Sequence, residues 1–148
     1  MKNSGTNKGN GMVRKKKKST KGSLVKYYAE GVGATVLESS VESVKRVIGR
    51  KSGIYILTKN GQPYYVGLAN KIRSRLGRHL KDKHKGKWDR FSIYLIGRKK
   101  FLKDIESILI RVLSPTGNGQ RGRFAKKGNL VSKLKAEILQ DVKHTLGI

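Results

Sequence analysis

The stretch from Gly53 to Gly67, GIYILTKNGQPYYVG, decides the fold of this chain. It consists of two runs of β-branched and aromatic residues with Asn60-Gly61 between them. An Asn-Gly pair in that setting is the strongest short-range signal of a β-hairpin. Each run carries a tyrosine close to a glycine, Tyr55 in the first and Tyr65 in the second. We therefore expect two antiparallel strands joined by a tight turn.

The turn allows two registers, and they place the tyrosines differently. If Asn60-Gly61 is a two-residue loop, Tyr55 pairs with Val66 and the two phenols lie on opposite faces of the sheet. If Lys59-Asn60-Gly61 is a three-residue loop that ends in a bulge, Tyr55 pairs with Tyr65 and both phenols share one face. Local sequence leaves both registers open.

Single residues indicate where some elements begin or lie. Pro63 has no amide hydrogen, so we expect the second strand of the hairpin at a sheet edge. Ser39 followed three residues later by Glu42 has the spacing of a capping box, which predicts a helix that begins near residue 40. Asn70 is a plausible N-cap of a later helix.

Hydrophobic spacing predicts further elements on both sides of the hairpin. We expect helices over residues 40–48, 70–81 and 101–113 and in the stretch after residue 130, and a third strand over residues 91–96. Glycines interrupt the apolar stretch 24–37, so its secondary structure stays open. Between the second helix and the third strand we expect a loop with Trp88 packed inward.

Composition divides the chain into four parts. Residues 1–23 are rich in glycine, serine and lysine and poor in apolar side chains, which predicts a disordered basic arm. Residues 24–52 form an N-terminal extension with a short helix, and 53–119 form the core. Residues 120–148 are a basic segment followed by a helix whose apolar stripe predicts that it packs on the core.

Charge is the strongest compositional feature: 35 Lys and Arg residues against nine acids give a formal net charge of +26. A polyphosphate partner would neutralise this charge and release counterions, so nucleic acid is the leading partner. An anionic membrane surface or a solvated basic exterior are the alternatives. The predicted contacts lie in the arm, on the helix 70–81 and after residue 120: Arg14, Lys15, Lys16, Lys17, Lys18, Arg73, Arg78, Arg121, Arg123, Lys126 and Lys127.

The chain contains no cysteine, which excludes disulfides and thiolate metal sites. No apolar run approaches the ~20 residues of a membrane span, and no signal-peptide core follows the first residues. We therefore expect a cytoplasmic protein with no membrane partner, associated with the nucleoid, or nuclear in a eukaryote.

Three polar residues occur beside apolar helix faces. Arg75 and His79 lie together on one flank of the stripe of the helix 70–81, where they can reach a cleft; ordinary surface positions are the alternative. Glu106 falls on the apolar side of the helix 101–113, and a buried carboxylate must be paired or bind a cation. A salt bridge to a basic side chain is the alternative. His84 has no partner at metal-ligand spacing and receives no role.

The helical wheel of residues 101–113 predicts which side chains are buried. The expected buried arc contains Leu102, Ile105, Leu109, Val112 and Leu113. The expected solvent strip contains Asp104, Ser107 and Arg111.

Gly53-Ile54-Tyr55 followed by Tyr65-Val66-Gly67 resembles the signature of the GIY-YIG nuclease superfamily, with valine for the middle isoleucine. That superfamily includes homing endonucleases, repair incision subunits and restriction enzymes. The resemblance continues in order and spacing at Arg75, His79, Glu106 and Asn118. It covers residues 53–118 and says nothing about the target.

The resemblance implies an α+β fold: a small three-stranded antiparallel β-sheet flanked by helices. It also implies that both signature tyrosines face one site, which favours the three-residue loop. The implied activity is hydrolysis of phosphodiester bonds, with double-stranded DNA as the leading substrate.

In the implied mechanism, Glu106 holds one Mg2+ (or Mn2+), which suits a hard cation that keeps several waters. Arg75 neutralises charge at phosphorus, and Tyr55 takes a proton from the attacking water. Tyr65 and His79 orient the water and assist proton transfer. Asn118 braces the site. The alternative is a catalytically silent nucleic-acid-binding module of the same fold, although such a module would be expected to have lost part of this set.

Overall fold

The computed structural model describes residues 22–124 and 130–148. The elements in chain order are β1 (Val25–Gly33), α1 (Val36–Ser39), α2 (Val41–Ile48), β2 (Gly53–Lys59), β3 (Gln62–Ala69), α3 (Ile72–His79), β4 (Arg90–Ile96), a short 3-10 helix (Lys99–Phe101), α4 (Leu102–Leu113) and α5 (Val131–Leu146). The predicted basic arm lies almost entirely outside the described residues.

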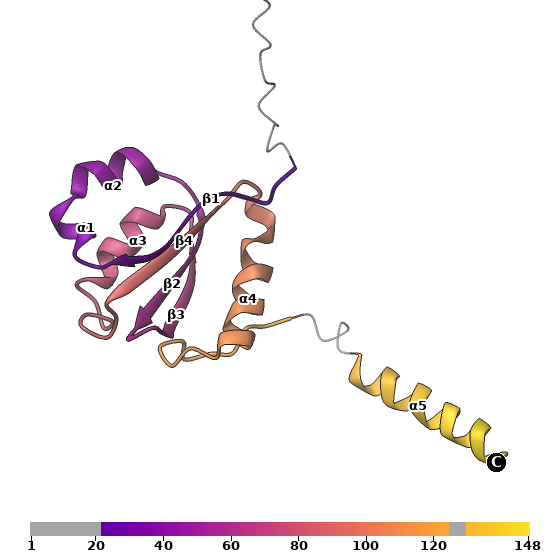
Figure 1. Cartoon of the computed structure of the whole chain (residues 1–148). Helices are drawn as coiled ribbons and strands as arrows, with labels where there is room; N and C mark the ends of the chain where they lie inside the picture. Colours follow the sequence, from indigo (N-terminus) through magenta and orange to yellow (C-terminus); the bar gives the residue numbers. More distant parts are fainter. Residues whose placement is uncertain (1–21, 125–129) are drawn as a thin grey trace, which may run out of the picture.

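The strands form one antiparallel sheet in the order β1-β4-β2-β3, with α1, α2 and α3 on one face and α4 on the other (Figure 1). The α+β class is confirmed. The expected number of three strands is wrong, because residues 25–33 pair with β4 as a fourth strand. Register shifts between Val25 and Tyr27 and between Ala29 and Val32 interrupt this pairing, so the stretch lacks a readable period-two alternation.

The hairpin has neither of the two expected registers. Lys59 faces Gln62 across a two-residue loop, so the three-residue loop is wrong. Positive φ angles at both loop residues, 50° at Asn60 and 76° at Gly61, are those of a turn that matches strand twist.

A bulge inside the hairpin brings Tyr55 and Tyr65 onto one face of the sheet, which the two-residue loop alone would not do. The register shifts between Leu57 and Thr58, which places Leu57 opposite Tyr65 and Tyr55 opposite Gly67. Side chains two residues apart share a face of a strand, so Tyr55 and Tyr65 lie on the same face. Their stacked rings have centroids 6.0 Å apart. The expectation that both phenols converge is confirmed.

Two hydrophobic clusters lie on opposite faces of the sheet. Tyr55, Leu57 and their neighbours pack against α2, α3 and Trp88, which is buried as expected. Ile54, Val66 and Ile96 pack against α4. The edge strand β3 therefore lies where the layer of α3 and the layer of α4 meet, and its edge position agrees with the expectation from Pro63.

Helix starts differ from the expectations. Ser39 ends α1, and the N-cap of α2 is Ser40 without a side-chain cap hydrogen bond, so the predicted capping box is wrong. The N-cap of α3 is Lys71 in place of Asn70. Neither α2 nor α3 begins with a side-chain cap hydrogen bond.

The predicted burial of α4 is wrong at two positions. Val112 is 74% exposed, whereas Ser107 is buried. The chain beyond the helix returns over it: a Cβ at Gly122 would overlap the Ser107 backbone, and the Arg111 Nε donates to the Gly122 carbonyl (2.8 Å). A contact from another segment therefore covers the predicted solvent strip.

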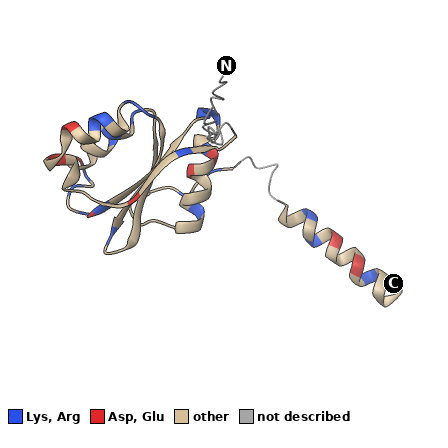
Figure 2. Ribbon diagram, turned by 45° about the horizontal axis from the view of Figure 1, so that its top comes forward, with Lys and Arg blue, Asp and Glu red and all other residues tan. Residues whose placement is uncertain are grey.

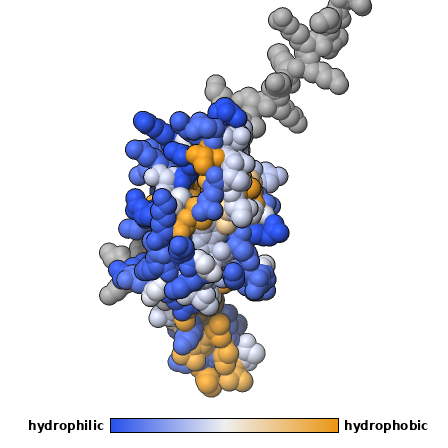
Figure 3. Space-filling model, turned by 90° about the vertical axis from the view of Figure 1, so that its left-hand side faces the viewer, coloured by the Kyte–Doolittle hydropathy of each residue, from blue (hydrophilic) through white to orange (hydrophobic). Residues whose placement is uncertain are grey.

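The helix α5 has no buried residue, so the expectation that it packs on the core is not met. Its apolar side chains, among them Leu134 and Ile138, are exposed, and Figure 3 shows apolar surface at the lower end of the molecule. No helix within residues 22–124 and 130–148 has the length and composition needed to cross a membrane.

Candidate active site

A cavity of about 370 Å³ lies beside the edge strand β3. Its walls come from β3, α3, the loop after α3, α4 and the loop after α4. Five of the six predicted catalytic residues line it: Tyr65, Arg75, His79, Glu106 and Asn118. The sixth, Tyr55, is 1% exposed and contacts the lining residues from behind. The structure thus brings all six together.

Two of the predicted residues occupy the free edge of β3. The Asn118 side chain accepts a hydrogen bond from the Val66 amide and donates one to the Val66 carbonyl, both at 2.8 Å. One Glu106 carboxylate oxygen accepts from the Leu68 amide at 3.0 Å. Backbone groups that an edge strand leaves unpaired are thereby satisfied by site residues. This pairing fixes Glu106 and Asn118 relative to the tyrosines.

Gly67, the last residue of the signature, is needed by the Tyr55 phenol. A Cβ at Gly67 would overlap the Tyr55 hydroxyl and the ring carbon that bears it. The Tyr55 ring therefore lies directly beside the backbone of β3 at Gly67. Its hydroxyl is 2.8 Å from Nε2 of His79.

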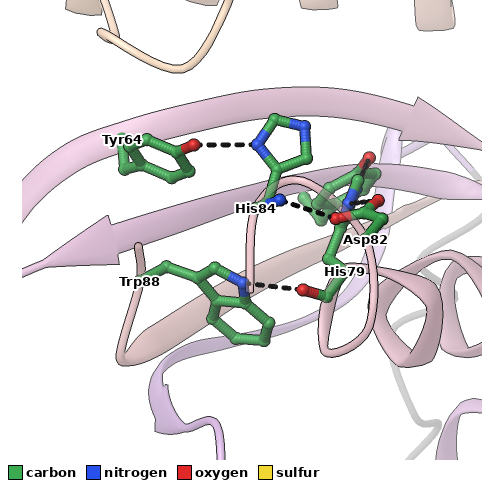
Figure 4. Close-up of polar contacts among 6 residues, drawn as sticks. Tyr64, His79, Asp82, His84 and Trp88 are labelled. Atoms are coloured by element: carbon green, nitrogen blue, oxygen red, sulfur yellow. Dashed lines mark hydrogen bonds and ion pairs between the residues drawn. The ribbon is translucent and has the colours of Figure 1, made fainter. Parts of the chain in front are cut away.

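His79 belongs to a chain of hydrogen bonds that extends into the loop after α3. Its Nδ1 lies 2.8 Å from Oδ2 of Asp82, and Oδ1 of the same carboxylate accepts from the His84 amide at 2.8 Å. The Trp88 indole donates to the His79 carbonyl at 3.3 Å (Figure 4). The His79 side chain is thus fixed from several directions.

His84, to which sequence analysis assigned no role, is buried beside these hydrogen-bonded residues. Its Nδ1 lies 2.9 Å from the Tyr64 hydroxyl (Figure 4), and its ring centroid is 4.7 Å from that of Tyr65. Asp82 was also missed. The spacing His79-x-x-Asp82-x-His84 at a helix end was the available signal, but its meaning depends on how the loop folds back.

Burial shapes the ionisation of the site. Desolvation raises the pKa of the Tyr55 phenol far above its ordinary range, Tyr65 adds to the rise, and Arg75 opposes it. Desolvation also lowers the pKa of His79, although Asp82 counteracts it. At neutral pH the phenol is therefore protonated and the imidazole is neutral.

Asp82 has the opposite balance. Burial alone would raise the pKa of its carboxyl, but the hydrogen bonds from the His84 amide and the His79 ring outweigh burial and lower that pKa. Asp82 is therefore ionised at neutral pH, and a carboxylate can accept hydrogen bonds but cannot donate them.

Glu106 fits the role of a ligand for a hard cation. Desolvation raises the pKa of its carboxyl, although the Leu68 amide, Lys103 and Arg75 oppose the rise. Among the described residues, none forms a salt bridge with Glu106, so the salt bridge considered as the alternative role of this residue is not observed. One oxygen faces the Leu68 amide, and the residue lines the cavity. A partly buried carboxylate without a paired cation is suited to bind one.

A second group of ligand types lies in the same cavity. His79, Asp82 and His84 bring potential ligand atoms within 4.8 Å of one another. The contact between His79 and Asp82 at 2.8 Å is a hydrogen-bond distance. Nδ1 of His84 is also engaged, with Tyr64. The geometry of the group is therefore that of a hydrogen-bond network.

Basic side chains flank the cavity. Arg121 and Arg123 line an adjoining cavity of about 270 Å³, which shares Glu106 with the first. Arg73 and Arg78 lie on α3, and Figure 2 shows that Lys and Arg occur on many elements of the described chain. The predicted contacts Arg14 to Lys18, Lys126 and Lys127 lie outside the described residues.

Residues 51–118 match the family model of the GIY-YIG catalytic domain. Over these residues the chain is similar to the GIY-YIG family, and a GIY-YIG domain indicates a family of nucleases. The match includes all six predicted catalytic positions and ends at Asn118. No curated protein sequence shows significant similarity to the chain.

Several solved structures are similar to the chain. The GIY-YIG N-terminal endonuclease domain of UvrC from Thermotoga maritima, bound to magnesium, shares 21% identity over 54% of this chain and 97% of that chain, with a TM-score of 0.46. A tyrosine-to-phenylalanine point mutant of that domain shares 20% identity with the same coverage and TM-score. An asparagine-to-alanine point mutant shares 19% identity over 55% of this chain and 98% of that chain, with a TM-score of 0.47.

Proposed function

We propose that this protein is an endonuclease that hydrolyses phosphodiester bonds in DNA and depends on Mg2+ or Mn2+. The observation that carries the proposal is the convergence of a carboxylate, a guanidinium, an imidazole and phenols on one cavity. These groups provide what phosphodiester hydrolysis requires: cation binding, charge neutralisation and proton transfer.

Glu106 is the proposed cation ligand. When bound there, the cation supplies charge stabilisation at the leaving oxygen. Asn118 positions Glu106 indirectly, because both side chains hold neighbouring backbone groups of β3. Arg75, which lines the same cavity, neutralises the charge that develops on the phosphate.

We assign proton acceptance to the hydrogen-bonded pair Tyr55 and His79. The Tyr55 phenol is a poor base alone, because burial raises its pKa. Its hydroxyl is hydrogen-bonded to a histidine that is neutral at neutral pH, so the pair can take up a proton together. Tyr65 lines the cavity and is placed to orient the attacking water.

DNA is the proposed partner because the chain combines a net charge of +26 with basic side chains beside the cavity. Arg121 and Arg123 would bind phosphates on the α4 side, and Arg73 and Arg78 on the α3 side. Such contacts position a backbone without reading its sequence.

The test is a cleavage assay with supercoiled plasmid, branched DNA and RNA in Mg2+, Mn2+ or EDTA. Glu106→Gln should abolish cleavage, and its matched control is Asp104→Asn, an exposed acid on the same helix. We expect metal-dependent DNA cleavage by the wild type and the control. Cleavage that survives both EDTA and Glu106→Gln would contradict the proposal, and cleavage of RNA alone would contradict the substrate.

The alternative is a catalytically silent nucleic-acid-binding module. Binding of DNA without cleavage in any metal would support it. The intact set of six residues around the cavity favours the enzyme, because a binding module has no use for a tyrosine–histidine pair buried behind its surface.

A further inference from the structure

Asp82 has no part in the chemistry described so far, yet both of its carboxylate oxygens make hydrogen bonds in the candidate active site. One carboxylate oxygen faces Nδ1 of His79 at 2.8 Å, and the other accepts from the His84 amide at 2.8 Å. The two oxygens therefore have separate and fixed partners. Nothing in this arrangement leaves the carboxylate free to rotate.

These contacts determine where the hydrogen atoms lie. A carboxylate can only accept, so Nδ1 of His79 must carry the hydrogen that points at Asp82. A neutral imidazole carries one hydrogen, so Nε2 has a lone pair. The Tyr55 hydroxyl, 2.8 Å from Nε2, then donates to it. The hydrogen bonds run in one direction, from Tyr55 through His79 to Asp82.

We propose that Asp82 is a positioning residue: it holds His79 in the tautomer whose Nε2 is open to the proton of Tyr55. The inference rests on the proposed endonuclease function and adds a residue to its proton path. Asp82 acts through His79 and does not touch the substrate.

The proton path balances without another reactant. Water gives a proton to the Tyr55 oxygen while the phenol passes its own proton to Nε2 of His79. The resulting hydroxide forms a bond to phosphorus, and the bond from phosphorus to the leaving oxygen breaks. The leaving oxygen takes up a proton from solvent. His79 becomes an imidazolium whose Nδ1–H still points at the Asp82 carboxylate, which stabilises the new charge. Asp82 itself remains ionised, and His79 later returns its proton to solvent through Tyr55.

The surroundings of His79 are consistent with this role. Trp88 donates to the His79 carbonyl, so the helix end that carries the ring is fixed (Figure 4). The charged and titratable groups that act on His79 come from β2, β3, α3 and the loop after it: Tyr55, Tyr65, Arg75, Arg78, Asp82 and His84. Asp82 is the acid among them, so it is the group that can stabilise an imidazolium.

Asp82→Asn is a sharp test because the contact with the His84 amide fixes the new side chain. The amide oxygen must face the His84 N–H, so the NH2 group faces Nδ1 of His79. Nδ1 must then accept, which places the hydrogen on Nε2 and blocks the proton of Tyr55. Asp82→Ala removes both contacts and imposes neither tautomer.

The first measurement is independent of cleavage. Two-bond 1H–15N NMR spectra of the wild type should show the His79 ring with a protonated Nδ1 and an unprotonated Nε2. Asp82→Asn should invert this pattern, and the matched control Asp104→Asn should not. His79→Gln assigns the signals among the three histidines of the chain. A wild-type ring protonated at Nε2 would overturn the inference.

The second measurement is kinetic. We expect Asp82→Asn to lower kcat by on the order of 10²-fold with little change in KM, because a general acid–base contribution is lost. Asp82→Ala should lose less activity than Asp82→Asn. A merely structural role predicts the reverse order, because asparagine keeps the size and the His84 contact. That reverse order would overturn the inference.

The proposed function and the role of Asp82 can be contradicted separately. A wild type that does not cleave contradicts the proposed function, while the tautomer of His79 still tests the hydrogen-bond chain. If instead His79, Asp82 and His84 bind Zn2+ in the purified protein, the 15N chemical shifts of the histidine rings would change on addition of a chelator. That outcome would also overturn the inference.

Discussion

Gly67 determines whether the Tyr55 phenol can reach the site. The ring lies so close to the β3 backbone that any side chain at position 67 would overlap the hydroxyl. Glycine is therefore required by a close approach, and its conformational freedom is not the reason.

We predict that Gly67→Ala lowers the free energy of unfolding by about 1–3 kcal/mol, the usual cost of overpacking a core. The matched control is Gly77→Ala, since a Cβ there meets no atom within 4 Å and the position is helical. The control should stabilise the protein by about 0.5–1 kcal/mol. Urea denaturation measures both, and equal effects would contradict the packing argument.

His79 gives the site a pH dependence with a definite sign. Its folded-state pKa is lowered by burial, and the neutral form is the one that accepts a proton. In the window below ~6.5 the unfolded chain binds more protons at this residue than the folded protein does. Its contribution to stability is therefore complete above that pH and is lost as the pH falls.

We predict that the acid limb of kcat/KM lies below pH ~6.5, the value for an unperturbed histidine. Cleavage rates measured across pH test this limb. An NMR titration of the His79 ring tests the pKa without cleavage. A limb or midpoint at or above that value would contradict the effect of burial.

At the scale of elements, the edge strand β3 is completed by side chains and not by another strand. Asn118 pairs with both backbone groups of Val66 as a neighbouring strand would. Glu106 takes the next free amide, that of Leu68. The same contacts protect the sheet edge and assemble the site.

We predict that Asn118→Ala lowers the free energy of unfolding by about 1–3 kcal/mol, because it leaves backbone groups of Val66 without partners. Amide hydrogen exchange should accelerate at Val66 and Leu68. It should change little at Ile56, which lies on the inner strand β2. Uniform acceleration across the sheet would indicate global destabilisation and contradict the local role.

The helix α5 stands apart from the sheet (Figure 1). Its apolar stripe is readable in the sequence, but none of its residues is buried. Its contribution to the stability of the core should therefore be small.

We predict that Ile138→Ala, in α5, changes the free energy of unfolding by less than about 0.5 kcal/mol, as surface substitutions usually do. Leu76→Ala, at a fully buried position in α3, should cost about 2–5 kcal/mol. Chemical denaturation monitored at Trp88 compares the two. A large effect at Ile138 would mean that α5 packs on the core in solution.

At the scale of the whole molecule, net charge should govern the association of the protein with nucleic acid. The net charge of +26 is spread over the core and both terminal segments, so association with nucleic acid should be dominated by phosphate contacts. The cavity, in contrast, depends on a few fixed side chains.

We predict that affinity for DNA falls by ~0.9 log units per log unit of salt for each phosphate contacted. Replacing Arg14 to Lys18 by alanine should reduce this slope and leave kcat unchanged. Fluorescence anisotropy at several salt concentrations measures the slope, with Lys133→Ala in α5 as a single-charge control. A flat salt response in the wild type would contradict nucleic acid as the partner.

Sequence alone determined the hairpin, the α+β class, the edge position of β3 and the identity of the six residues around the cavity. The hairpin and the edge position follow from local signals, an Asn-Gly turn and a proline without an amide hydrogen. Each of these two signals acts within a few residues of the chain. The α+β class and the six residues follow from the resemblance to the GIY-YIG family.

Tertiary structure decided the rest. The bulge between Leu57 and Thr58, and not the turn, brings the tyrosines onto one face. The pairing of residues 25–33 with β4 adds a strand that the sequence does not indicate by alternating apolar and polar residues. Gly122 covers Ser107, which the helical wheel placed in solvent. Asp82 and His84 join the site because the loop after α3 folds back. In each case the deciding contact joins segments distant in sequence or depends on a local irregularity, and hydrophobic periodicity encodes neither.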